Sequence, residues 1–214
     1  MTEFDAALGA GLSELGLVWT EEQLMQLVRF AGLLQRWNKV YNLTAIRCDA
    51  DILTHHLLDS AALVPFVKSI APQAQTVLDV GSGGGLPSIP LAILRPDLRV
   101  TAVDAVSKKT AFLTQVAIEL RLRNFNTKHA RVETLSGQWD VITSRAFASL
   151  SDFTLLTEKL ISPSGHWLAM KGVVPEDELS MLGSRIQISE ILPMTVPGLD
   201  EERHLVVLKP VEHG

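Results

Sequence analysis

Residues 77–92 read VLDVGSGGGLPSIPLA, and this stretch decides the fold. A short, mainly apolar run, 77–80, leads directly into residues 81–85, which hold four of the chain's 14 glycines, and an apolar segment follows. A strand, a glycine loop and a helix in this order form the edge at which open parallel sheets bind ligands. Glycine lets the chain turn sharply and lets ligand atoms approach the backbone, and the first N–H groups of the helix can donate to them. The stretch therefore predicts a parallel α/β sheet with a ligand site at this loop.

The chain after Pro72 fits such a sheet, because β-branched runs alternate there with helical segments. Strands are expected at residues 76–80, 99–104, 126–130, 140–144, 165–170, 186–192 and 204–209. Helices are expected at residues 87–94, 108–122, 152–161 and 176–183, with Ser107 as the cap of the second. No long helix separates the last two strands. The expected sheet is therefore doubly wound and mostly parallel, with seven strands and an antiparallel end.

The chain before Pro72 has the apolar spacing of helices instead. Thr20 and Gln23 form a capping-box pattern at the start of one helix, and another helix should begin at Asp49. We therefore expect a small helical region over residues 1–71 and an α/β domain over residues 72–214.

The composition is that of an ordinary globular protein, with 47% hydrophobic and 20% charged residues among 214. The net charge is −5 and the pI is about 5.7, so any nucleic-acid partner would have to meet a local basic patch. The single cysteine, Cys48, excludes an internal disulfide. No apolar run is long enough to span a membrane, and the N-terminus lacks the features of a signal peptide, so a cytoplasmic location is expected.

The spacing of the glycines distinguishes between cofactors. Asp79, Gly81, Gly83 and Gly85 form the pattern D-x-G-x-G-x-G, which resembles the first motif of class I S-adenosylmethionine-dependent methyltransferases. The dinucleotide-binding pattern G-x-G-x-x-G does not fit, because Leu86 stands in place of its third glycine. The glycine spacing and the antiparallel end of the sheet favour S-adenosylmethionine as the cofactor.

Asp104 supports an adenosine-containing cofactor. It ends the next expected strand, where an acidic side chain can accept hydrogen bonds from both ribose hydroxyls. NAD-dependent enzymes place an acidic residue similarly, so Asp104 alone leaves both cofactors open. An NAD-dependent enzyme or a non-catalytic binding module therefore stays an alternative at this point, and an intact glycine loop with its acidic partner argues against the inert module.

Further stretches extend the resemblance over nearly the whole chain, from about residue 19 to residue 209. They are RWNKVYNLTAIR (36–47), HHLLDS (55–60), SRAFASL (144–150), MKG (170–172) and ERHLVVLK (202–209). Together with the glycine loop they resemble the ribosomal RNA small subunit methyltransferase G family, also called glucose-inhibited division protein B. One departure is Ser88, where many relatives have glycine, and we expect it to affect packing more than chemistry.

The resemblance implies a Rossmann-like class I methyltransferase fold, with residues 72–214 as the S-adenosylmethionine-binding domain. It implies methylation of N7 of a guanine in the decoding-region loop of bacterial 16S ribosomal RNA, within the small subunit. The expected cofactor-binding residues are Gly81, Gly83, Leu86, Asp104, Val132, Glu133 and Arg145. Two alternatives remain open: Glu133 as a solvated acid at a helix start, and Arg145 as a structural partner of Glu133 or Asp79.

The sequence lacks the motifs of several other methyl acceptors. Enzymes that methylate exocyclic amines usually carry a Pro-Pro motif after the fourth strand, which this chain lacks, and Cys48 lies in no motif of a cysteine nucleophile. The lone pair of guanine N7 is available at neutral pH, so proximity and orientation suffice and no acid–base residue is assigned. Arg145, Phe147 and Lys171 are the candidates for positioning the base, although an aromatic residue such as Phe147 is more often part of a core.

A metal is not expected. His55 and Asp59 share a helix face beside His56, but a third ligand at suitable spacing is missing. The segment should instead pack near the cofactor loop with one histidine exposed. We expect a monomer, and the alternative acceptor is a small molecule or a protein.

Overall fold

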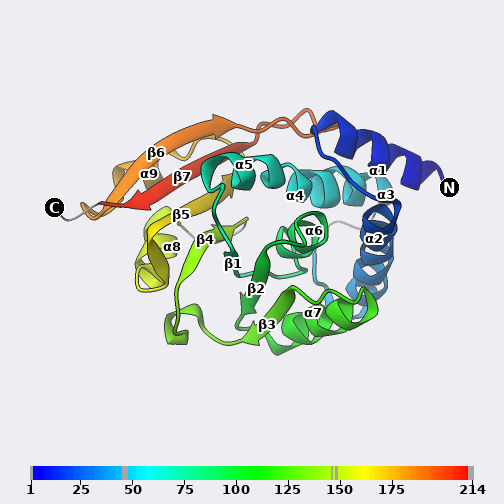
Figure 1. The fold of residues 1–214 in the computed structure, drawn as a ribbon, viewed down its shortest axis with the longest axis horizontal. Coiled ribbons are helices and arrows are strands. Elements are labelled where there is room, and N and C mark those ends of the chain that lie inside the picture. The colour runs from blue at the N-terminus through cyan, green and yellow to red at the C-terminus, as the bar shows by residue number, and fades with distance from the viewer. Residues whose placement is uncertain (1, 45–47, 146, 148, 212–214) are drawn as a thin grey trace.

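The computed structural model describes residues 2–44, 48–145, 147 and 149–211, and a seven-stranded sheet runs through its centre (Figure 1). The strands lie in the order β3-β2-β1-β4-β5-β7-β6. Their bounds are β1 Thr76–Val80, β2 Arg99–Asp104, β3 Phe125–His129, β4 Trp139–Ser144, β5 Ile161–Lys171, β6 Ile186–Pro193 and β7 His204–Pro210. Neighbours among β1–β5 are parallel, and β7 is antiparallel to both β5 and β6. The predicted sheet, with its antiparallel end, is confirmed.

Helices cover both faces of this sheet (Figure 1). In the first part of the chain they are α1 Glu3–Glu14, α2 Glu21–Tyr41, α3 Asp49–Asp51, the π-helix η1 Ile52–Leu58, α4 Asp59–Ala61 and α5 Leu63–Ile70. Between the strands they are α6 Ser88–Leu94, α7 Ser107–Glu119, the 3-10 helix η2 Val132–Thr134, α8 Leu150–Thr157 and α9 Glu176–Ser180. The reciprocal capping box of Thr20 and Gln23 is present at the start of α2, as predicted.

The alternating side chains of the strands divide the core into two buried clusters. Val77 and Val141 belong to the cluster that contains α2, α5, α6 and α7, whereas Leu78 and Ile142 belong to the cluster under α8. Successive residues of a strand point to opposite faces, so this division follows from the period of two in β1 and β4. Burying each such side chain contributes on the order of 1.5–3 kcal/mol relative to exposure.

The N-terminal helices share the first of these clusters with the sheet. Leu27 and Leu34 of α2 are fully buried in the same cluster as Ile89 of α6 and Leu113 of α7. The connection between β6 and β7 also packs against these helices, because a Cβ on Gly198 would lie 3.2 Å from the side chain of Thr54 in η1. The boundary between residues 71 and 72 stays a prediction. Among the described residues, no helix is long and apolar enough to cross a membrane.

Several predicted boundaries were wrong, each for a local reason. Ser107 is not a cap: Val106 holds the N-cap position without a side-chain hydrogen bond, and Ser107 is the first residue of α7. The helix expected over 152–161 ends at Thr157, because Ile161 instead begins β5, where it pairs with Trp139 just before a shift of register between Trp139 and Val141. A short apolar run reads equally well as helix or strand, and the pairing partner decides. The strand expected over 126–130 begins one residue earlier, at Phe125.

Candidate active site

The glycine loop joins β1 to α6 at the carboxyl edge of the sheet. Gly81, Gly83 and Gly85 have φ values of 67°, 56° and 84°, in the left-handed region that favours glycine. The backbone N–H of Gly81 donates to the carbonyl of Val103 at 3.0 Å, which fastens the loop to the end of β2. The loop is therefore held in one shape by backbone geometry that few other residues could adopt.

Asp104, the last residue of β2, is buried and faces this loop. Its Oδ2 accepts from the backbone N–H of Gly83 at 3.0 Å, and its Oδ1 accepts from the N–H of Val106 at 2.8 Å. The ammonium of Lys109 lies 3.7 Å from Oδ2. A carboxylate has about four lone-pair sites, so both oxygens retain acceptor capacity for a ribose. The structure thus brings Gly81, Gly83 and Asp104 together, as a cofactor site requires.

Asp79 is a fully buried carboxyl group at the end of β1. Neither of its oxygens has a hydrogen bond of standard geometry among the described residues. Burial raises the pKa of Asp79 to about 7, although the nearby Ser88 and the charge of Arg145 favour the ionised form. Buried polar groups in proteins nearly always have partners. An orphaned carboxyl group behind a glycine loop fits a site that is completed by a bound polar molecule.

The remaining predicted cofactor residues lie around this loop with differing exposure. Leu86 and Val132 are buried, and Val132 begins η2 after β3. The backbone N–H of Ala130 donates to the carbonyl of Asp104 at 3.2 Å, so the segment leading to Val132 starts beside the end of β2. The side chain of Glu133 is 42% exposed, and its Oε1 lies 3.9 Å from Nη1 of Arg131. The ion-pair partner of Glu133 is therefore Arg131 and not Arg145, and its contact with an adenine stays a prediction.

A cavity of about 360 Å³ opens beside the ends of β4 and β5 and contains two of the predicted base-positioning residues. It is lined by His55, His56, Asp59, Arg145, Met170, Lys171, Gly172, Met194 and Arg203. These residues come from η1, α4, two strand ends and the β6–β7 connection. Segments far apart in the chain therefore meet at one cationic cavity.

Asp59 organises the arginines of this cavity. Its side chain is only 4% exposed, and its two oxygens accept separately: Oδ2 from Nη1 of Arg145 and Oδ1 from Nε of Arg203, both at 3.1 Å. Nη1 of Arg145 also donates to the carbonyl of His55 at 2.7 Å. The structural partner of Arg145 is thus Asp59. The sequence had suggested Glu133 or Asp79 as this partner, and that suggestion was wrong.

Lys171 and Phe147 occupy different positions. The ammonium of Lys171, at the end of β5, donates to both oxygens of Glu178 in α9, at 2.9 and 2.8 Å. The ring of Phe147 packs against Phe153 of α8, with 5.9 Å between the ring centroids, and would lie 3.6 Å from a Cβ on Gly81. Phe147 is therefore a half-buried residue that connects the core to the glycine loop.

His56 is a buried neutral group at this site. Its Nε2 lies 2.7 Å from the hydroxyl of Thr44. Burial and the positive charge of Arg145 lower the pKa of His56 to about 4, so the imidazole is uncharged at neutral pH. His55 is partly exposed, as expected for one of the two histidines. In the part of the chain that the structure describes, no group of three or more His, Cys, Asp and Glu side chains could hold a metal ion.

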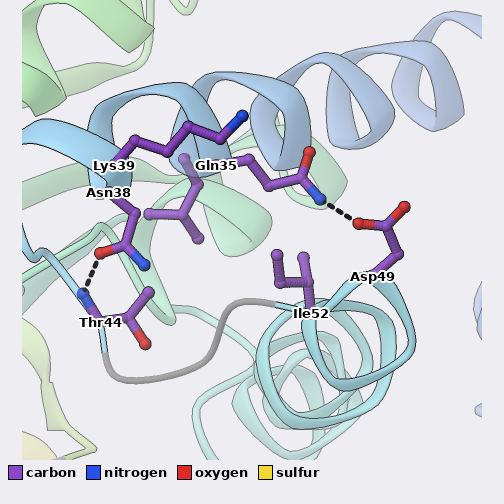
Figure 2. Close-up of a pocket in the computed structure, with 7 residues that line it drawn as sticks. Gln35, Asn38, Lys39, Thr44, Asp49 and Ile52 are labelled. Carbon is purple, nitrogen blue, oxygen red and sulfur yellow. Dashed lines mark hydrogen bonds between the residues drawn. The ribbon is translucent and has the colours of Figure 1, made fainter.

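A second cavity, of about 390 Å³, lies between α2 and the start of the following helix. Figure 2 shows Gln35 hydrogen-bonded to Asp49 on one side of this cavity and Asn38 hydrogen-bonded to Thr44 on the other side. Leu34, which also lines this cavity, would lie 3.1 Å from a Cβ on Gly84. The glycine loop is therefore packed between the sheet and the wall of this cavity.

Comparison with known proteins agrees with this geometry. A family model described as rRNA small subunit methyltransferase G matches residues 23–206. A ribosomal RNA small subunit methyltransferase G from Ralstonia nicotianae (strain ATCC BAA-1114 / GMI1000) is 53% identical over 209 residues, which cover 95% of this chain and 94% of that protein. Another, from Acidovorax sp. (strain JS42), is 48% identical over 219 residues, covering 98% and 97%. The chain belongs to this family.

The fold of this member of the methyltransferase G family recurs in solved structures at low sequence identity. Coclaurine N-methyltransferase, bound to N-methylheliamine and SAH, has a TM-score of 0.55 and 13% identity, and the match covers 96% of this chain and 93% of the other. The predicted class I methyltransferase fold is therefore confirmed. The predicted enzyme class, an rRNA methyltransferase that uses S-adenosylmethionine, is confirmed by the family and the fold.

Three residues of this methyltransferase site were not singled out from the sequence as site residues. The sequence pattern points to neither Arg203 nor Glu178, and it suggests Asp59 only as a metal ligand. A signal was present for two of them, because Asp59 is the only acidic residue in the mainly apolar segment 52–70 and Arg203 directly precedes β7. Their role became visible only when the fold placed them on either side of one cavity.

Proposed function

We propose that this enzyme transfers a methyl group from S-adenosylmethionine to N7 of a guanine in the decoding-region loop of 16S ribosomal RNA. One observation carries the choice of atom: among the described residues of the cationic cavity, no group is placed to act as a general base. Asp59 is committed to two arginines and Glu178 to Lys171. Both ring nitrogens of His55 have partners, Thr54 and Glu201, and His56 has a pKa of about 4. An acceptor that must lose a proton would lack a base here, whereas guanine N7 needs none.

The cofactor would be held at the glycine loop. When bound, S-adenosylmethionine supplies an electrophilic methyl group on a positively charged sulfur. Asp104 would accept hydrogen bonds from the ribose hydroxyls, and the backbone of Gly81, Gly83 and Leu86 would contact the rest of the molecule. Val132 and Glu133 would border the adenine, since they follow β3 beside the end of β2.

The guanine would be oriented from the cationic side. Arg145 is fixed by Asp59 and the carbonyl of His55, so its guanidinium cannot rotate freely. Lys171 lines the same cavity, and Phe147 lies beside Gly81, where its ring can contact a base. Holding N7 in line with the methyl–sulfur bond is then the main catalytic contribution of the chain.

The experiment that tests this function uses small ribosomal subunits from cells lacking the gene. Purified protein and labelled S-adenosylmethionine are added, and N7-methylguanine is mapped by strand cleavage. We expect cleavage at one guanine of the decoding-region loop. Label at another atom or in another RNA would contradict the proposal, and label in a protein or a small molecule would favour the alternative acceptor.

Asp104→Ala should weaken the binding of S-adenosylhomocysteine by about 2–3 kcal/mol, the range of lost charge-assisted hydrogen bonds. Calorimetric titration measures this difference directly. Asp200→Ala, a change of the same type in the β6–β7 connection, is the control and should leave the affinity unchanged. Equal affinities of the wild type and Asp104→Ala would remove Asp104 from the cofactor site.

We also infer that the enzyme acts in the cytoplasm, as a monomer and without a metal. An rRNA substrate supports the location, and methyl transfer to an available lone pair supports the absence of a metal. Sedimentation at assay concentration checks the monomer, and unchanged turnover after chelation checks the metal.

A further inference from the structure

The exposed carboxylate of Glu201 lies at the rim of the cationic cavity. This residue belongs to the connection between β6 and β7, and its side chain is 60% exposed. Its Oε2 accepts from Nη2 of Arg203 at 3.0 Å, and its Oε1 lies 3.3 Å from Nε2 of His55. Arg203 and His55 both line the cavity, but Glu201 does not. A carboxylate from outside therefore occupies two donor positions of the cavity.

The arginine that meets Glu201 is oriented from the opposite, buried side. Nε of Arg203 donates to Asp59 at 3.1 Å, and Nη1 donates to the carbonyl of Glu202 at 2.8 Å. Nη2 is left to point toward the exposed carboxylate. Because Asp59 is almost fully buried, it fixes this guanidinium whether or not Glu201 is in place. Arg203 and His55 are thus a preformed anion site with a replaceable occupant.

The chemistry of the occupant points to its natural competitor. A carboxylate and a phosphodiester each carry one negative charge on two oxygens, and arginine recognises both. An exposed ion pair contributes only about 0–1 kcal/mol, so exchanging Glu201 for another anion costs little. We propose that Glu201 takes the place of a backbone phosphate of the ribosomal RNA, and that this phosphate displaces it and binds to Arg203 and His55.

This inference rests on the RNA substrate of the family and is independent of which guanine atom is methylated. The net charge of the chain is −5, so attraction to RNA phosphates has to come from local cationic sites such as this one. Phosphate contacts of this kind position an RNA without reading its sequence.

The test compares Glu201→Gln with Glu202→Gln. Both changes remove one negative charge at adjacent exposed positions, but only Glu201 forms an ion pair with Arg203. Binding to unmethylated small ribosomal subunits is measured in the presence of S-adenosylhomocysteine. We expect Glu201→Gln to bind about threefold to fivefold tighter than the wild type, and Glu202→Gln to stay within about twofold. Cofactor affinity should be unchanged in both.

A third variant shows whether Arg203 is the group released. Arg203→Lys keeps a positive charge for Asp59 but lacks the nitrogen that reaches Glu201, so it avoids leaving a buried carboxylate unpaired. Adding Glu201→Gln to Arg203→Lys should change binding by less than about twofold. Equal effects of Glu201→Gln and Glu202→Gln, or a full gain in the Arg203→Lys background, would overturn the proposal. Methylation at an unexpected atom would overturn only the proposed function.

Discussion

Gly85→Ala should lower the free energy of unfolding by about 2–4 kcal/mol, the sum of a left-handed backbone cost of about 1 kcal/mol and an overpacking cost of about 1–3 kcal/mol. Gly85 has a φ of 84°, and a Cβ there would lie 2.7 Å from the side chains of both Ile89 and Leu113. Those two side chains are fully buried in the core, so neither can move aside easily. Denaturant unfolding of the purified variant measures the loss.

Gly16→Ala separates the two causes. Gly16 also has a positive φ, of 71°, but a Cβ there would meet nothing within 4 Å. Its replacement should therefore cost only the backbone part, about 1 kcal/mol. If Gly85→Ala cost no more than Gly16→Ala, the contact with Ile89 and Leu113 would be relaxed by movement of α6, and the loop would be less rigid than its packing indicates.

The parts of the fold predicted most accurately depend on neighbours in the sequence. The bounds of β1 and β2 match the predicted residues 76–80 and 99–104, and the capping box of α2 is in place. Apolar runs bounded by turn residues, and a cap three residues from its partner, are local signals. The π-helix η1 had no such signal, because its hydrogen-bond register depends on packing rather than on residue type.

The candidate site also has parts that local sequence signals predict and parts that depend on the fold. The glycine loop and Asp104 follow from a strand–loop–helix pattern within one βαβ unit, so the sequence could place them. The partner of Arg145 could not be predicted, because Asp59 is 86 residues away, and Arg203 is 144 residues from Asp59. From the sequence alone, Asp59 is equally consistent with a metal ligand and with a buried polar residue, because its two arginine partners become visible only in the fold.

Among the changes of charge, replacing Asp59 should lower the free energy of unfolding the most. Asp59→Asn keeps the volume of the side chain but leaves two guanidinium groups, with side chains 23% and 18% exposed, without their shared anion. Breaking a buried ion pair by removing one partner costs about 3–5 kcal/mol, and the partial exposure of both arginines lowers the expected loss to about 2–4 kcal/mol. Denaturant unfolding of the purified variant and the wild type measures it.

Asp97→Asn is the matched control, and it shows whether the burial of the carboxylate or its distance from the arginine determines the loss of stability. Asp97 lies closer to its partner, with Oδ2 2.6 Å from Nη2 of Arg95, but its side chain is 60% exposed. Water replaces an exposed carboxylate at little cost, so this change should cost about 0–1 kcal/mol despite the shorter contact. Equal losses of unfolding free energy in the two variants would mean that Arg145 and Arg203 find other partners when asparagine replaces Asp59. The shape of the cavity would then depend on its backbone and not on the buried carboxylate. Asp59 would also not be what orients Arg203, and the proposed exchange of Glu201 for a phosphate depends on that orientation.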